Sequence, residues 1–294
     1  MMFFNMLVGC GKSFTGDRDD SLFTIIEELT FIYNLNEPVK TYRMPGKLVE
    51  ISGISYVSDD HMICIEDETG HLYNFNLESG KVDSAWKFSG DGDYEDVAIV
   101  NDTVYVIESD GDIYKFHLSK EGAHESVKYE NDLSAWNDTE GLCYDPVSGS
   151  LLIACKEEKD LNGKTIDGNP IYSFSTKDFR LASNPFYTLT AGKLKSFFEA
   201  HRDFNYEIER IEVKPSGIAY NPLDGYFYLL ASVGKMIIVI DHKKNIKATY
   251  SIPEQLLEQP EGITFSPDGK LWISTEGGKG PGKILAFEPI DSGR

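Results

Sequence analysis

A short motif with an acidic or hydroxyl side chain recurs along the chain and could support metal chemistry. It reads Glu-Gly-Leu at residues 140–142 and Glu-Gly-Ile at 261–263, each copy followed by an aromatic residue and a proline turn. Glutamate also takes the first position at Glu95, whereas serine takes it at Ser52 and Ser216. Carboxylates without histidine or cysteine suit a hard cation, and Ca²⁺ takes about six to eight oxygen ligands. These glutamates are therefore candidate Ca²⁺ ligands.

The motif marks an internal repeat of five units. Its first residues, from Ser52 to Glu261, are separated by 43, 45, 76 and 45 residues, which is close to the period of a propeller blade. In each unit, short β-branched and aromatic runs alternate with turn signals, as expected for a β-meander. The pattern predicts an all-β, five-bladed β-propeller in one domain over residues 22–294. A six-bladed ring is the alternative, if the N-terminal segment forms most of a blade with material from the long gap.

Two further segments have expected places in such a ring. The stretch from Phe23, which contains the alternating run LTFIYNL, is expected to add an outer strand to the last blade, because this removes the remaining free sheet edge. The stretch from Thr190 has Leu194, Phe197 and Phe198 at helical spacing behind a possible Thr190 cap. It predicts a helix inserted between blades three and four.

Propeller geometry would gather the candidate residues at one mouth of the central channel. The first strand of each blade lines the channel, and a hairpin brings the start of that strand beside the end of the second strand. Five residues stand at those second positions: Asp67, Glu108, Lys156, Ser232 and Glu276. The predicted metal ligands are Glu95, Glu140, Glu261, Glu108, Glu276 and Asp67. The predicted ligand-binding residues are Lys156, Ser52, Ser216 and Ser232.

Carboxylates that are held close together repel one another, and something must offset this repulsion. A pair at about 5 Å costs about 3 kcal/mol at an effective dielectric constant of about 20. Protonation, Lys156, solvent or Ca²⁺ could relieve this repulsion. Alternatively, each glutamate could bond neighbouring backbone N–H groups and fix the blade register. In the second unit, Asp96 replaces the motif glycine, which suggests a looser channel wall or one more carboxylate near the mouth.

Composition restricts the classes of partner. The formal net charge of −20 opposes binding to nucleic acid or to anionic lipid. The odd set Cys64, Cys143 and Cys155 lacks Cys-x-x-Cys spacing and predicts buried apolar residues rather than a zinc site or disulfides. The loop 156–170 lacks the glutamate of a calcium loop, so its acidic residues, such as Asp160, are interpreted as turn residues.

Residues 1–21 have features of a lipoprotein signal and tether. Leu7-Val8-Gly9-Cys10 resembles the bacterial lipobox, in which the cysteine is lipidated, although no basic residue precedes the short apolar stretch. We expect a cell-envelope protein anchored through Cys10. The alternative is an accidental match in a periplasmic or secreted protein.

The repeats together resemble a known family. The similarity covers Tyr42 to Pro289 and is carried by EISGI, DYEDVAIV, ESDGDIY, NDTEGL, PSGIAYNP and PEGITF. This pattern is similar to the SdiA-regulated, YjiK-like family of bacterial envelope β-propellers, which is distantly related to NHL-repeat propellers. The resemblance implies a five-bladed propeller that binds calcium and leaves the biochemical role undefined.

Three functions are compatible with these features. The first is a monomeric, calcium-binding envelope module that recognises a small molecule, a glycan or an envelope protein. The second is a metal-dependent hydrolase of the lactonase, esterase or phytase type, for which no Ser/His/Asp order or Gly-x-Ser-x-Gly motif is present. The third is a scaffold for protein partners. Whether the protein is an enzyme stays open at this level.

Overall fold

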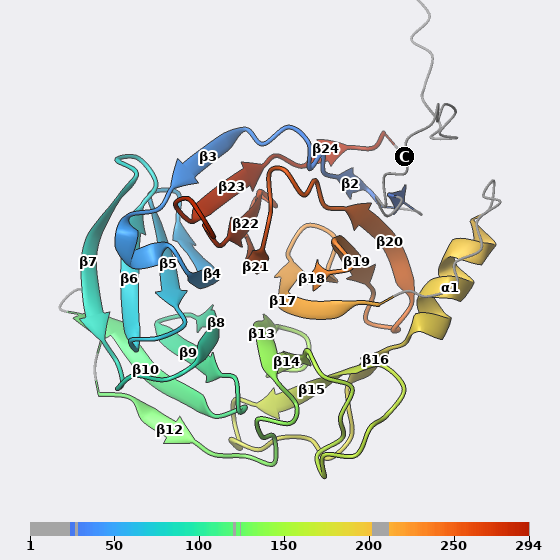
Figure 1. Ribbon diagram of the computed structural model, residues 1–294, viewed down its shortest axis with the longest axis horizontal. Coiled ribbons are helices and arrows are strands. Elements are labelled where there is room, and N and C mark those ends of the chain that lie inside the picture. Colours follow the sequence, from blue (N-terminus) through green and yellow to red (C-terminus); the bar gives the residue numbers. More distant parts are fainter. Residues whose placement is uncertain (1–23, 27–28, 120–121, 124, 202–211, 294) are drawn as a thin grey trace, which may run out of the picture.

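The computed structural model describes residues 24–26, 29–119, 122–123, 125–201 and 212–293. Antiparallel sheets are arranged as five blades around a central axis (Figure 1), so the predicted five-bladed β-propeller is confirmed. The innermost strand of every blade lies beside the innermost strands of its two neighbours, which closes the ring. The six-bladed alternative is wrong.

Each blade is a meander that runs outward from the axis. Blades one and two consist of β4 (Ile51–Ser58), β5 (His61–Glu66), β6 (His71–Asn76) and β7 (Lys81–Lys87), and of β8 (Tyr94–Val100), β9 (Thr103–Glu108), β10 (Ile113–Ser119), β11 (Gly122–Ala123) and β12 (Val127–Tyr129). Blade three consists of β13 (Thr139–Asp145), β14 (Ser150–Cys155), β15 (Asn169–Ser175) and β16 (Tyr187–Leu189).

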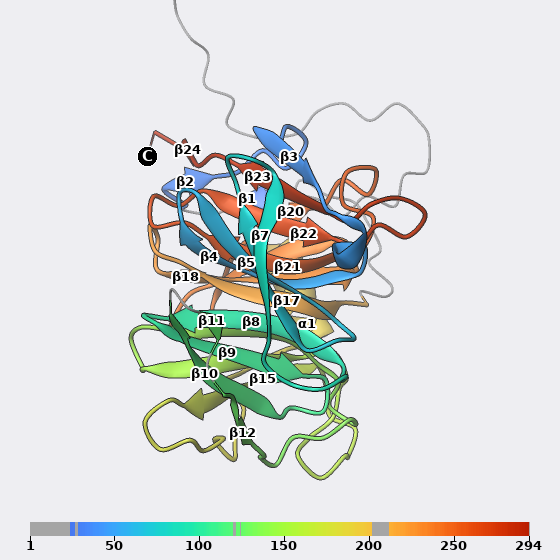
Figure 2. The ribbon, with the colours of Figure 1, turned by 90° about the vertical axis from the view of Figure 1, so that its left-hand side faces the viewer.

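The last two blades incorporate N-terminal strands. Blade four consists of β17 (Lys214–Asn221), β18 (Tyr226–Val233), β19 (Met236–Ile240), β20 (Ile246–Ser251) and β1 (Ile25–Ile26). Blade five consists of β21 (Pro260–Phe265), β22 (Leu271–Thr275), β23 (Lys283–Phe287) and β3 (Lys40–Arg43). A short 3₁₀-helix, η1 (Gly46–Leu48), connects β3 to blade one. In Figure 2, β7 is in front as the outer strand of blade one.

The ring is closed by an N-terminal strand, but not by the one that the sequence suggested. Strand β3 pairs antiparallel with β23, so the outer strand of the last blade does come from the N-terminal segment. The run LTFIYNL instead contains β2 (Phe31–Ile32), which pairs with β24 (Ile290–Asp291). Its residues Leu29, Tyr33 and Leu35 are buried in the apolar core between blades four and five. The alternation in this run therefore reflects burial against two blades rather than a long strand.

Apolar contacts between neighbouring blades form the core. Five buried clusters occupy the five interfaces between blades. Between blades one and two, for example, the rings of Phe88 and Phe116 stack with centroids 5.2 Å apart. Each blade therefore buries apolar side chains on both faces of its sheet, and this burial stabilises the ring through the hydrophobic effect.

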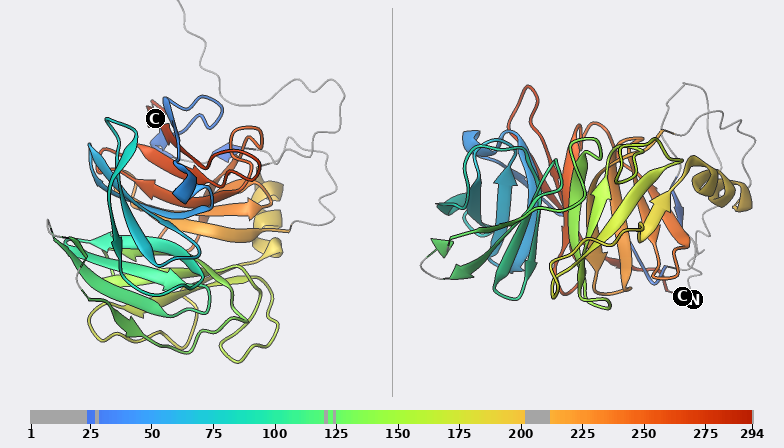
Figure 3. Two further views of the ribbon diagram at one scale, coloured as in Figure 1. Left: turned by 60° about the vertical axis from the view of Figure 1, so that its left-hand side comes forward. Right: turned by 90° about the horizontal axis from the view of Figure 1, so that it is seen from below.

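The predicted helix is present as α1 (Ala191–Ala200), between blades three and four. Thr190 caps it, because its side-chain oxygen accepts a hydrogen bond from the backbone N–H of Lys193 at 3.1 Å. Leu194, Phe197 and Phe198 pack into the core of the interface between these blades. Figure 3 shows the helix at the periphery of the ring, so it leaves both ends of the channel uncovered.

Other expectations concern single residues. The thiols of Cys64, Cys143 and Cys155 are free and buried, as predicted. Asp160 accepts hydrogen bonds from the backbone N–H groups of Asn162 and Lys164, which confirms its role as a turn residue. Cys10 and the rest of the signal-like segment lie outside the described residues. Within the described part of the chain, no helix is both long enough and apolar enough to cross a membrane.

Candidate cation site at one end of the channel

The motif residues stand on β-bulges. The register of the first and second strands shifts in all five blades at the motif. The residues skipped by the pairing include Ser52, Glu95, Glu140, Ser216 and Glu261. A bulge bends the strand and redirects a side chain, and bulges are frequent beside functional sites. Sequence reasoning placed these residues at strand starts but did not detect the bulges.

The glycine of the motif allows neighbouring blades to approach closely. A Cβ atom on Gly141 would lie 2.8 Å from the backbone nitrogen of Ile218 in the next blade, and one on Gly262 would lie 2.6 Å from the backbone oxygen of Ser52. Both distances are too short for any side chain. The repeated glycine is therefore explained by contact between blades.

Asp96 takes the position of the motif glycine in blade two. It neither loosens the channel wall nor adds a carboxylate at the mouth, so both expectations for this residue are wrong. It is buried, and its two carboxylate oxygens accept hydrogen bonds from the backbone N–H groups of Val97 at 2.8 Å and Leu142 at 2.7 Å. Leu142 belongs to blade three, so the side chain connects two blades. Burial raises the pKa of Asp96.

The two serines of the motif also connect blades. The Ser52 hydroxyl donates to the backbone oxygen of Tyr94 at 2.9 Å, and the Ser216 hydroxyl donates to that of Pro260 at 2.7 Å. In both cases the acceptor lies at the start of the next blade's innermost strand. Both hydroxyls therefore form hydrogen bonds between blades. Ser232, the third serine predicted to bind a ligand, lies half-buried near the end of β18.

Glu140 and Lys156 form an ion pair across one hairpin. Glu140 is only 4% exposed, and the Lys156 ammonium group donates a hydrogen bond to its Oε1 atom. The same ammonium nitrogen lies 3.8 Å from Oδ2 of Asp138. Burial lowers the pKa of Lys156, but Glu140 and Asp138 raise it overall, so this lysine is charged at neutral pH. The hairpin geometry that the sequence predicted is correct for this pair.

The three motif glutamates act on one another electrostatically. Burial raises the pKa of Glu140 to about 7, although Lys156 opposes the shift. Burial and the charges of Glu140 and Glu276 raise the pKa of Glu261 to about 8. For Glu95, burial followed by the charges of Glu140 and Asp93 raises the pKa to about 10. Three carboxyl groups from blades two, three and five therefore share one poorly solvated region with one ammonium group.

The acidic region continues toward blade one. Burial raises the pKa of Asp67 to about 6, with Glu50 and Glu66 as further causes, and one Asp67 carboxylate oxygen is buried without a partner among the described residues. Burial and the charge of Asp67 raise the pKa of Glu276, whose Oε2 atom accepts a hydrogen bond from Gln259 at 2.9 Å. The structure thus brings Asp67 and Glu276 to the same end of the channel as the motif glutamates.

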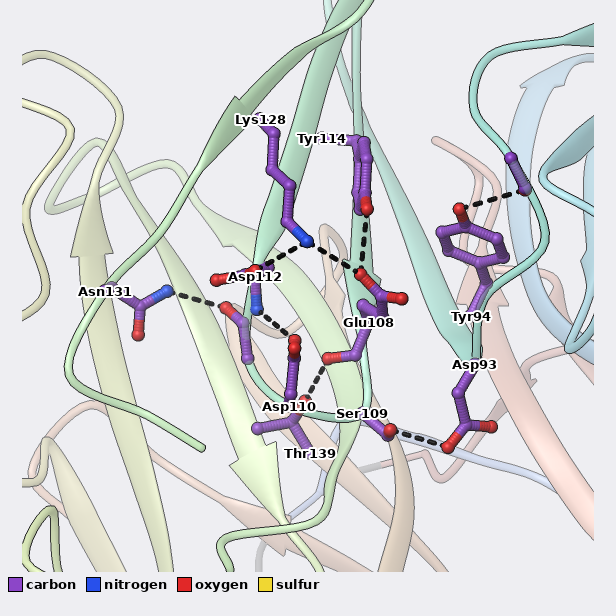
Figure 4. A network of polar contacts seen from close by, with 12 residues as sticks. Asp93, Tyr94, Glu108, Ser109, Asp110, Asp112, Tyr114, Lys128, Asn131 and Thr139 are labelled. Carbon is purple, nitrogen blue, oxygen red and sulfur yellow. Dashed lines mark hydrogen bonds and ion pairs between the residues drawn. The ribbon is translucent and has the colours of Figure 1, made fainter. Parts of the chain in front are cut away.

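Glu108 belongs to a different acidic group, which also contains Asp110 and Asp112 (Figure 4). Within the described ranges, these are the only three potential ligand residues whose ligand atoms lie within 4.8 Å of one another. Lys128 on β12 lies 2.7 Å from Asp112 and 3.3 Å from Glu108, and the Tyr114 hydroxyl donates to Glu108 at 2.8 Å. The Glu108 carboxylate is therefore engaged with outer strands of its own blade. Asp110 and Asp112 were missed, although their spacing in ESDGDIY was a visible signal.

A hard cation fits the donor chemistry of the channel end. The predicted metal ligands there, Glu95, Glu140, Glu261, Glu276 and Asp67, all offer carboxylate oxygens, which Ca²⁺ prefers. The oxygens of Glu95, Glu140 and Glu261 are not all within 4.8 Å of one another, since this trio is absent from the compact groups of the described chain. Lys156 already supplies a positive charge to Glu140. A metal ion would therefore have to compete with Lys156 for this carboxylate and draw the other two toward it.

Comparisons with known proteins give the family and the fold. A family model described as SdiA-regulated matches residues 34–279. No curated protein sequence matches the chain. Among solved structures, the glutaminyl cyclase of Myxococcus xanthus is similar with a TM-score of 0.57 and 12% identity over 87% of this chain and 97% of that one. The PQQ-bound aldose sugar dehydrogenase of Streptomyces coelicolor has a TM-score of 0.54 and 14% identity over 86% and 98%, respectively. At such identities the likeness shows the β-propeller fold alone.

Proposed function

The chain belongs to the SdiA-regulated family, and from this premise we propose that it is a binding propeller whose acidic channel end takes a cation, with Ca²⁺ as the preferred ion. The observation that supports this proposal is the shared region of Glu95, Glu140 and Glu261. They come from three blades, burial raises the pKa of each, and the charge of Lys156 opposes the rise in all three. A divalent cation would stabilise the ionised forms of these groups.

Each residue has a defined part in the proposed site. Glu95, Glu140 and Glu261 would supply oxygen ligands, and Glu276 and Asp67 would add negative charge from blades five and one. Bound Ca²⁺ would supply a fixed positive charge with room for further oxygen ligands, such as those of a bound molecule. In the metal-free protein, Lys156 would serve as the counter-ion of Glu140.

The cellular setting is part of the same proposal. We place the protein in the bacterial envelope, anchored through Cys10, on the basis of the Leu7-Val8-Gly9-Cys10 sequence. In this setting the ring would display its channel end to a small molecule, a glycan or another envelope protein. Replacing Cys10 by serine should release the protein from membranes and abolish labelling by a radioactive fatty acid.

Calorimetric titration with Ca²⁺ at pH 8, after removal of divalent ions by a chelator, tests the cation site. We expect saturable binding by the wild type and weakening of at least about tenfold in Glu261→Gln, because a buried carboxylate ligand is lost. Glu108→Gln is the matched control and should bind as the wild type does, since Glu108 is engaged with Lys128 and Tyr114.

Lys156→Gln sharpens the same experiment. If the metal and the lysine compete for Glu140, removal of the ammonium group should strengthen Ca²⁺ binding. Absence of heat from the wild type and from Lys156→Gln would contradict the proposal. Loss of binding in Glu108→Gln alone would move the site to the outer part of blade two.

A further inference from the structure

A cavity of about 300 Å³ lies in the channel at the end opposite the motif glutamates. Residues of the innermost strands of all five blades line it, and these strands, β4, β8, β13, β17 and β21, surround the axis in Figure 1. In every blade the lining residues come after the motif glycine or, in blade two, after Asp96. The cavity therefore lies toward the turns between the first and second strands, at what we call the turn end of the channel.

Aromatic side chains recur at one position of this lining. Three residues after the motif glycine stand Tyr56, Tyr144 and Tyr220 in blades one, three and four. The equivalent residues are Phe265 in blade five and Ile99 in blade two. The three tyrosines are partly exposed, and no cationic side chain of the described chain lies over their rings. These rings are therefore not already occupied by an internal ammonium group.

The three tyrosines take the same position relative to their own turns. The Tyr56 hydroxyl donates a hydrogen bond to Oδ1 of Asp59 in the β4–β5 turn at 2.7 Å. A Cβ atom on Gly149, in the β13–β14 turn, would lie 4.0 Å from the hydroxyl oxygen of Tyr144, and Tyr220 likewise reaches the turn of blade four. Each ring therefore stands between the end of an innermost strand and the adjacent turn, where it borders the cavity.

Aspartates surround this end of the channel. Every turn between a first and a second strand carries or directly follows at least one: Asp59, Asp60, Asp102, Asp145, Asp224 and Asp268. The only lysine or arginine in these five turns is Lys270, whose ammonium nitrogen lies 2.9 Å from Oε1 of Glu288. The turn end of the channel is therefore negatively charged, which attracts cations and disfavours anions.

The negative charge reaches the residues that line the cavity. Burial raises the pKa of Tyr56 to about 12, and the charge of Asp268 in blade five is among the further causes. Burial also raises the pKa of Tyr220, with the charges of Asp145 and Asp224 as further causes. Aspartates of at least three blades thus act electrostatically on the lining, so a cation in the cavity would be stabilised from several sides.

The lining itself selects the kind of cation. Among the described residues that line the cavity, none is charged at neutral pH, so a metal ion would lose water there without gaining a carboxylate ligand. The walls instead offer tyrosine rings and aliphatic side chains, such as those of Ile54 and Ile218. Aromatic rings attract cations that lie within about 6 Å of them, and quaternary ammonium groups are bound in this way. A methylated ammonium group suits both the walls and the surrounding charge.

From these observations we propose that the turn end of the channel binds a small quaternary ammonium compound. Tyr56, Tyr144 and Tyr220 would contact its methyl groups, and the aspartates of the turns would attract its charge without direct contact. The volume of about 300 Å³ is at the lower end of the range for small-molecule sites and accommodates a trimethylammonium group with a short tail. This site shares no residue with the cation site, so the two can be tested independently.

The test uses choline and tetramethylammonium as probes, with saturation-transfer NMR and calorimetry on the full chain. Choline should bind saturably with a Kd below about 10 mM, as expected for a small ligand with few polar contacts. The matched control ligand is 3,3-dimethylbutan-1-ol, which has the shape of choline without its charge. We expect it to bind at least about fivefold more weakly, because the attraction to the rings and aspartates is lost.

Variants of the tyrosines separate the ring from the hydroxyl. Tyr56→Leu and Tyr144→Leu remove a ring, and each should weaken choline binding by about fivefold or more. Tyr56→Phe and Tyr144→Phe keep the ring and should bind choline within about twofold of the wild type. Asp60→Asn removes a charge near Tyr56 and should weaken binding about twofold at low salt, with less effect at high salt.

Several outcomes would overturn the proposal. These are no saturable binding of choline or tetramethylammonium, equal binding of the neutral alcohol, or unchanged affinity in both leucine variants. If Tyr144→Leu does not fold, as judged by circular dichroism, Tyr56→Leu decides, since Tyr56 is partly exposed and lies outside the buried clusters between blades. Choline that is displaced by Ca²⁺ would belong to the acidic end and would also overturn it. Loss of Ca²⁺ binding with choline binding intact would contradict only the cation proposal.

Discussion

Two acidic groups in this propeller differ in how their charges are balanced. Glu108, Asp110 and Asp112 lie within 4.8 Å of one another, yet Lys128 and the Tyr114 hydroxyl contact this group at 2.7–3.3 Å. Glu95, Glu140 and Glu261 are more widely spaced, but burial raises the pKa of each. The compact group looks more like a metal site, whereas the dispersed group has more unbalanced charge.

The difference shows that proximity alone does not identify a cation site. The side chain of Lys128 is 40% exposed, so solvent also screens the compact group. The side chain of Glu140 is 5% exposed, and its repulsion with the neighbouring glutamates is poorly screened. Free energy gained from a bound cation should therefore be larger at the channel end. The following predictions compare the two groups.

Removal of the lysine from each group should have the largest effect on the free energy of unfolding. It should also give the largest difference between the two groups. At pH 8 in chelator, Lys156→Met leaves the buried Glu140 carboxylate without its partner, and we expect the free energy of unfolding to fall by about 3 kcal/mol. Lys128→Met removes a more exposed partner and should cost less than about 1 kcal/mol. Urea denaturation measures both. Equal losses would contradict the distinction between the two groups.

The pH dependence of stability should come mainly from the channel end. Because the pKa values of Glu140 and Glu261 are raised to about 7 and about 8, the folded state binds more protons than the unfolded state above pH about 4.5. At low pH both groups are protonated in the folded and the unfolded state, and they do not lower the free energy of unfolding. As the pH rises toward 8, the unfolded state ionises them more readily than the folded state does, so the free energy of unfolding falls. We expect the metal-free protein to lose at least about 2 kcal/mol between pH 5 and pH 8.

Two changes should reduce this loss. Glu261→Gln removes one titrating group, and saturating Ca²⁺ favours the ionised glutamates at pH 8, so both should flatten the curve obtained by urea denaturation across pH. Glu108→Gln serves as the control. A metal-free protein that is more stable at pH 8 than at pH 5 would show that these glutamates are not held in a region that disfavours their charge.

The fold could be predicted because the same strand and turn pattern occurs in five units of the sequence. Each unit carries the same motif and turn signals, so an uncertain strand in one unit is supported by the others. Ring closure has no such repetition. The run LTFIYNL alternates as a strand would, but Leu29, Tyr33 and Leu35 alternate because they are buried between blades four and five, and Lys40–Arg43 forms the closing strand. Sequence alternation does not distinguish these two causes.

The site was predictable only as far as hairpin geometry determines it. Glu140 and Lys156 meet because both stand at one end of the β13–β14 hairpin. Glu108 occupies the equivalent position, but its partner Lys128 lies on β12, a strand for which no repeat gives a register. The use of Ser52 and Ser216 between blades likewise depends on bulges that the sequence did not reveal.

The smallest effect should separate the serines of the motif from its glutamates. Ser216→Ala removes the hydroxyl that donates to the Pro260 backbone oxygen, and we expect it to lower the free energy of unfolding by about 1 kcal/mol, since a buried acceptor loses its partner. Ca²⁺ affinity should not change, because this hydroxyl connects blades four and five. Ser232→Ala, at a half-buried serine near the same mouth, is the matched control and should alter neither quantity. If Ser216→Ala instead weakens Ca²⁺ binding about tenfold with stability intact, the serine is a ligand, and the whole ring of motif residues belongs to the cation site.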